Sequence, residues 1–134
     1  MKRSFGSRRG GAMVESALVF LVFSVLMAGI LELGVVGFAA NSVAFAAHRA
    51  ARFASLRGST SGHAASVDDI RAAARTAAAP LNSANVTVNV SWNPNNNPGG
   101  SVQVTVAYAL RPALLPISVG PLTLQSIARA GIVQ

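Results

Sequence analysis

The chain has 134 residues, of which 51% are hydrophobic and 11% are charged, and its lysines and arginines exceed its acids by seven. This length provides one domain, or one membrane segment with a small head. The chain has no cysteine, which excludes disulfides, thiolate metal sites and cysteine nucleophiles.

The positive charge is concentrated at the N-terminus. Lys2, Arg3, Arg8 and Arg9 lie within the first ten residues, and no acid accompanies them. A basic cluster beside an apolar run indicates a membrane surface rather than nucleic acid. It also predicts a cytoplasmic N-terminus, with the rest of the chain on the outer side.

The apolar run that follows is long enough to cross a membrane. Residues 12–40 exceed the roughly 20 residues that a spanning helix needs, although Glu15 and Glu32 interrupt them. A soluble core helix is the first alternative, but a head of this size could not surround it. A cleaved secretory signal is the second, and its apolar stretch of about 7–15 residues would be shorter.

The helix is predicted to continue to Arg57, because residues 39–57 contain no glycine or proline and are rich in alanine. Gly58 is expected to cap it. From Ala12 to Arg57 such a helix measures about 69 Å. Small residues allow close helix packing, so we expect its upper part to bundle with other helices. The alanines concerned are Ala39, Ala40, Ala44, Ala46, Ala47, Ala50, Ala51 and Ala54.

Residues 58–134 are predicted to form a small extracytoplasmic head. Ser66 and Asp69 form an approximate capping box that starts a short amphipathic helix, which Pro80 ends. Alternating apolar residues then predict strands at 86–92 and 102–110, joined by a hairpin loop, and a third strand at 122–133. Trp92 continues the apolar side of the first strand and is expected to be at least partly buried. The fold class is α+β, with one long helix, one short helix and an antiparallel meander.

No enzyme site is indicated by the remaining polar residues. The chain has four acids, two in the long helix and two adjacent at a helix start. His48 and His63 are the two histidines, whereas a metal site needs three or four ligands. We therefore predict a protein that is not an enzyme and that uses no metal, cofactor or small-molecule substrate.

The stretch RRGGAMVESALVFLVFSVLMAGILELG resembles the start of type IV pilins and pseudopilins, and is most similar to the TadE-like minor pseudopilins of the tight-adherence (Tad, or Flp) pilus. In that family a basic leader ends in a glycine, and a glutamate stands at the fifth mature position. Gly10, Gly11 and Glu15 match this pattern, and Glu32 stands where members often carry a second acid. Ser16 departs from the aromatic residue that usually follows the glutamate.

This resemblance implies that residues 1–10 are a leader removed by prepilin peptidase after Gly10. Residues 11–57 would then be the pilin-like helix. The implied role is that of a minor pseudopilin in the bacterial inner membrane, which assembles with other pilins of the Tad system and supports adhesion and biofilm formation. The alternatives are a single-pass anchor with an uncleaved leader, whose head binds a periplasmic partner, and a secreted soluble domain.

Glu15 is expected to pair with the new amine of Gly11, either in its own subunit or in a neighbour, because an unpaired carboxylate in lipid is costly. Two interpretations of Glu32 remain open. It is either hydrated at the outer interface or a second polar contact with a neighbouring subunit. The second interpretation expects Glu15 and Glu32 to lie on the same side of the helix.

Overall fold

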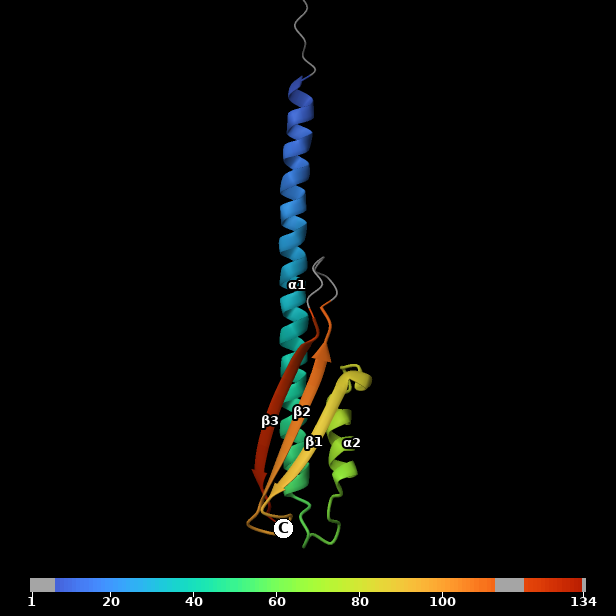
Figure 1. Ribbon diagram of the computed structural model, residues 1–134, viewed down its shortest axis with the longest axis vertical. Helices are drawn as coiled ribbons and strands as arrows, with labels where there is room; N and C mark the ends of the chain where they lie inside the picture. Colours follow the sequence, from blue (N-terminus) through green and yellow to red (C-terminus); the bar gives the residue numbers. More distant parts are fainter. Residues whose placement is uncertain (1–6, 113–119, 134) are drawn as a thin grey trace, which may run out of the picture.

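The computed structural model describes residues 7–112 and 120–133 and has the α+β architecture predicted from the sequence (Figure 1). A single long helix runs the length of the molecule, and a small sheet with a second helix packs on its C-terminal half. The elements are α1 (Ser7–Ser55), α2 (Val67–Ala77), the 3-10 turn η1 (Ser83–Asn85), β1 (Val86–Asn93), β2 (Ser101–Leu110) and β3 (Leu122–Gly131).

α1 contains 49 residues and is therefore about 74 Å long. It begins before the predicted Ala12 and ends two residues before the predicted Arg57. The expected glycine cap is wrong, because Gly99 is the only glycine with a positive φ in the described ranges. Gly58 instead begins the next turn. The Gly58 carbonyl accepts a hydrogen bond from the Ser61 backbone N–H at 3.1 Å and a second one from the Ser61 hydroxyl at 2.8 Å.

The three strands form an antiparallel sheet in the order β1-β2-β3. Val90 lies opposite Val104, and Val104 lies opposite Ala128, so one apolar face runs across all three strands. The predicted third strand is confirmed and ends at Gly131. The predicted alternation of β2 is strict: Val102, Val104 and Val106 are fully buried, and their neighbours are only partly covered.

The head has two layers, with the sheet on one side and the two helices on the other (Figure 1). Ile70 and Ala74 of α2 are buried in the same core as the valines of β2. Trp92 is half-buried against this core, as the sequence predicts. Its indole Nε1 is buried and has no hydrogen-bond partner in the described residues.

The alanines in the upper part of α1 have a different role from the one predicted. Ala46, Ala47 and Ala50 are completely buried, and they belong to the core formed with the sheet and α2. Their small side chains therefore allow the chain's own head to approach the helix closely. The prediction that this alanine-rich surface bundles with other helices is wrong for its six buried members, Ala39, Ala46, Ala47, Ala50, Ala51 and Ala54.

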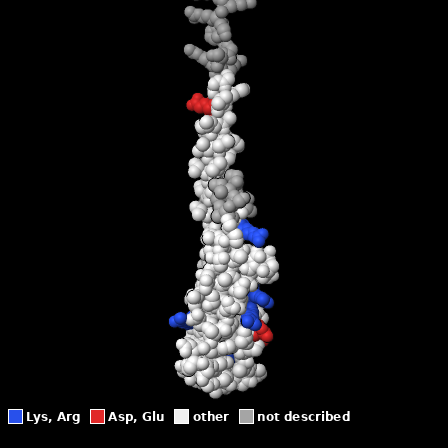
Figure 2. Space-filling model, in the orientation of Figure 1, with Lys and Arg blue, Asp and Glu red and all other residues white. Residues whose placement is uncertain are grey.

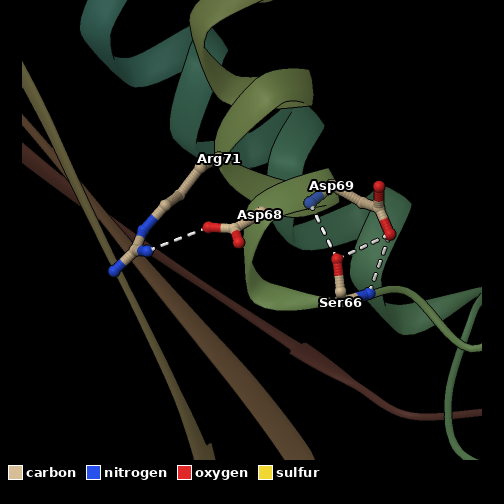
Figure 3. A network of polar contacts seen from close by, with 4 residues as sticks. All are labelled: Ser66, Asp68, Asp69 and Arg71. Atoms are coloured by element: carbon tan, nitrogen blue, oxygen red, sulfur yellow. Dashed lines mark hydrogen bonds and ion pairs between the residues drawn. The ribbon is translucent and has the colours of Figure 1, made fainter.

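α2 begins with the capping box predicted from the sequence (Figure 3). The Ser66 hydroxyl accepts a hydrogen bond from the Asp69 N–H at 3.1 Å, and the Asp69 carboxylate accepts one from the Ser66 N–H at 3.0 Å. The carboxylate also accepts a 2.7 Å hydrogen bond from the Ser66 hydroxyl. Asp68 pairs with Arg71 at 3.1 Å. Both acids of the head are thus engaged within the first turns of α2.

The pKa of Asp69 is lowered from its ordinary value of 3.8, first by the hydrogen bond from the Ser66 hydroxyl, then by that from the Ser66 backbone, and last by the positive charge of Arg57. A carboxyl group whose pKa is lower in the folded state stabilises the fold above its unfolded pKa. That contribution is lost as the pH falls through the folded pKa.

Ser66→Ala is therefore expected to lower the free energy of unfolding of the head by about 1 kcal/mol at pH 7. It should also raise the pKa of Asp69 toward its ordinary value, since the largest cause of the shift is removed. Urea unfolding followed by Trp92 fluorescence, together with NMR titration of the carboxyl, measures both effects. Thr60→Ala, in the preceding loop, is the control, because Thr60 is exposed. An unchanged Asp69 pKa in Ser66→Ala would show that the capping box does not control this carboxyl.

Candidate assembly site on the long helix

Gly10 and Gly11 lie within the first turns of α1 and are exposed. A Cβ atom built on either residue would meet no other atom within 4 Å. Packing within the chain therefore gives no reason for glycine at these two positions, and helix propensity disfavours it.

Glu15 is also exposed, one helical turn beyond Gly11. It borders a shallow apolar groove with Val19 and Phe20, and it forms no ion pair with the described side chains. The side chains of Arg8 and Arg9, and all of Lys2 and Arg3, lie outside the described part of the chain. A cut after Gly10 would create an amine at the start of a helix, where a carboxylate in the first turn is favourable.

Glu32 is placed differently from Glu15. Its side chain is only 7% exposed, so the chain's own fold covers it. It lines an apolar groove between α1 and the end of β2, together with Gly29, Val36 and Pro112. This burial does not fit a fully hydrated carboxylate. A contact between Glu32 and a neighbouring subunit stays a prediction.

The expected shared side for the two glutamates is wrong. α1 is a continuous helix between Glu15 and Glu32, and 17 residues at about 100° each make about 1,700°, roughly 100° short of five turns. The two carboxylates therefore point in directions about 100° apart. One polar surface of the helix therefore cannot contain both carboxylates.

The part of α1 that lies free of the head has the length of a membrane span. No side chain between Gly10 and Leu31 is buried, and these 22 residues measure roughly 33 Å, close to the thickness of the hydrocarbon core. Burial by the head begins at Glu32 and continues at Ala39 and Val43. α1 is also the helix among the described residues that is long and apolar enough to span a membrane.

In the described residues, histidines and acids do not gather into a metal site. Among the described residues, no three His, Asp or Glu side chains are close enough together to hold a metal ion. His48 lies on α1 and His63 in the loop before α2, so the fold does not combine the two histidines into a site.

One exposed surface of α1 was not predicted from the sequence. The side of α1 turned away from the sheet is exposed and carries Phe45, His48, Arg49 and Arg52, which border one groove. The signal that could have revealed it is the seven-residue spacing of Phe38, Phe45 and Arg52, which places them on one side of a helix.

Comparison with known families now assigns the helix. A family model described as TadE-like protein matches residues 10–52. The helix is therefore similar to that of TadE-like proteins. The match confirms the resemblance seen in the sequence and includes Gly10, Gly11, Glu15 and Glu32. The family is associated with the Tad pilus and is structural rather than enzymatic, and the apolar helix fits a single-pass membrane anchor.

The TadE-like match ends before the head, because residues 53–134 lie beyond it. No curated protein and no solved structure matches the chain. The family therefore describes the helix, whereas the properties of the head follow from its own geometry.

Proposed function

We propose that this TadE-like protein is a minor pseudopilin of the Tad pilus, processed by prepilin peptidase after Gly10. The observation that carries the proposal is the set of exposed residues at the start of α1. Gly10 and Gly11 have no packing role, and Glu15 has no ion-pair partner in the described chain. Cleavage after Gly10, followed by pairing of Glu15 with the new amine of Gly11, gives these residues a role.

The proposed membrane segment of the processed protein is Gly11–Leu31, which leaves the head directly at the outer surface of the inner membrane. With the basic leader inside, the head faces outward. Glu15 then lies about 6 Å from the cytoplasmic end of the mature helix. At that depth an ionised carboxylate is stabilised by pairing with an amine. Incorporation into a surface pilus would support adhesion and biofilm formation.

Gly10→Leu is expected to abolish processing in the native host and to leave a full-length precursor in the inner membrane. Gly10 is exposed, a Cβ there meets no atom within 4 Å, and leucine favours helix, so loss of cleavage would reflect the peptidase rather than misfolding. Mass spectrometry of the purified protein measures the N-terminus. The expected N-terminus of the unmodified protein is Gly11.

Gly34→Leu is the matched control, since Gly34 is also helical and exposed, and a Cβ there meets no atom within 4 Å. This variant should be processed normally. If Gly10→Leu still loses its first ten residues, the assigned cleavage site is wrong. If the unmodified protein keeps Met1 in a host with an active prepilin peptidase, the uncleaved-anchor alternative replaces the pseudopilin.

A further inference from the structure

Beyond Leu31, α1 exposes a continuous surface on the side opposite the sheet. We call it the outer face and define it by Phe38, Phe45, His48, Arg49, Arg52 and Leu56. Phe38, Phe45 and Leu56 are 56%, 54% and 54% exposed. Exposed aromatic, aliphatic and arginine side chains in one contiguous area are typical of protein interfaces.

Most of the outer face lies too far from the membrane to contact lipid. Phe45 is 14 residues beyond Leu31 and Arg52 is 21 residues beyond it, which correspond to roughly 21 Å and 31 Å along the helix. The headgroup layer outside the hydrocarbon core is only about 5–8 Å thick. A bilayer therefore does not cover Phe45 or the arginines.

In the described residues, no acid pairs with the positive charges of the outer face. Beyond Glu32 the sequence contains seven arginines and two acids. Asp68 pairs with Arg71, and Asp69 binds Ser66. The basic side chains that are visible in the space-filling view lie on the head (Figure 2). Arg49 and Arg52 form no ion pair in the described structure.

A second copy of the chain is a poor partner for this surface. Two outer faces in contact would bring Arg49 and Arg52 of one copy to the same residues of the other, and like charges at an interface cost several kcal/mol. A partner that complements the face must supply carboxylates. The required chemistry is therefore that of a different, acidic chain.

The geometry of the outer face suits a helix. Phe38, Phe45 and Arg52 recur every seven residues, which is the spacing of a seam between two nearly parallel helices. Phe38 and Phe45 are nearer the membrane, and Arg52 lies about 10 Å beyond Phe45 along the helix. Arg49 lies over the Phe45 ring, 6.0 Å from its centroid, so apolar and cationic side chains of the face are adjacent.

We propose that the outer face packs against a helix of a different pilus subunit, which places apolar residues on Phe38 and Phe45 and carboxylates on Arg49 and Arg52. This inference rests on the proposed function, because it names the partner chemistry of a pilus subunit. It also means that the protein enters an assembly as a minority component, since self-association through this face brings like charges together.

The test uses the full chain at native expression in its own host. Benzoylphenylalanine replaces Phe45, and cross-linked peptides are identified by mass spectrometry after irradiation. Ile127 is the matched control position, since it is 52% exposed on β3, away from α1. We expect the Phe45 probe to cross-link a helix of another pilus subunit at a site with a carboxylate within one or two turns. The Ile127 probe should not cross-link that helix.

Reversing the charge of the two arginines then tests whether they bind carboxylates of the partner helix. In Arg49→Glu/Arg52→Glu the yield of the cross-link should fall about tenfold or more, because two like-charge contacts replace attractions. Arg75→Glu/Arg129→Glu changes the net charge equally and should leave the yield within about twofold of the parent value. Replacing the carboxylate of the cross-linked helix with lysine should restore the yield with the reversed face.

Cross-linking to a second copy, to lipid alone, to a helix without carboxylates, or to nothing would each overturn the inference. Loss of the cross-link in the control double variant, or no rescue by the lysine substitution, would also overturn it. The proposed function fails separately, if deletion of the gene leaves surface pili unchanged. Pili that depend on the gene, without the expected cross-link, would contradict only this inference.

Discussion

Glu15→Leu is expected to leave membrane insertion and cleavage intact and to reduce assembly strongly. Insertion should be at least as efficient as in the parent protein, because the cost of an acid in lipid disappears. The amine of Gly11 would lose its partner, and removing one member of a buried ion pair costs about 3 kcal/mol, or more than a hundredfold in a binding constant. Co-purification with the major pilin and the number of surface pili measure the loss.

Glu15→Gln separates charge from shape, since the amide is close in size to the carboxylate. We expect Glu15→Gln to reduce assembly, as Glu15→Leu does. Ser16→Ala is the neighbouring control, because Ser16 is exposed and lies on a different side of the helix. A simple anchor would tolerate or gain from the loss of Glu15. Normal pili and normal adherence in both Glu15 variants at native expression would contradict the pairing mechanism.

Ala50→Phe is expected to unfold the head while leaving α1 in the membrane. Ala50 is 0% exposed, and it lies in the core where the sheet and α2 meet α1. Inserting extra methylenes into a packed core typically costs 1–3 kcal/mol, and a phenyl ring is larger, so we expect a loss of about 3 kcal/mol or more. Protease resistance of the head and thermal unfolding of the detergent-solubilised chain measure it.

Ala40→Phe is the matched control on the same helix, because Ala40 is exposed. It should leave the melting temperature of the head nearly unchanged. If both variants unfold at the parent temperature, then α1 and the sheet are not held together by the close contact described above. The alanines would in that case be free for the helix bundling predicted from the sequence.

The fold could be predicted well from local patterns. The Ser66–Asp69 capping box and the alternation of Val102, Val104 and Val106 depend on neighbours in the sequence, and the structure confirms both. The start of the candidate site was equally visible, since the spacing of Gly10, Gly11 and Glu15 is a property of the chain itself. The predicted glycine cap at Gly58 was wrong because two hydrogen bonds from Ser61 hold that glycine in a different turn.

The sequence by itself therefore determined a long apolar helix with a basic start, a glutamate near its beginning and a small α+β head. Only the tertiary structure decided which side of that helix packs against the head and which side stays exposed. Alanines such as Ala46 and Ala50 indicate that something approaches closely, but small size is equally suitable for a sheet or for a helix. Once the head occupies that side, Glu32 is buried and the outer face of α1 is left for a partner.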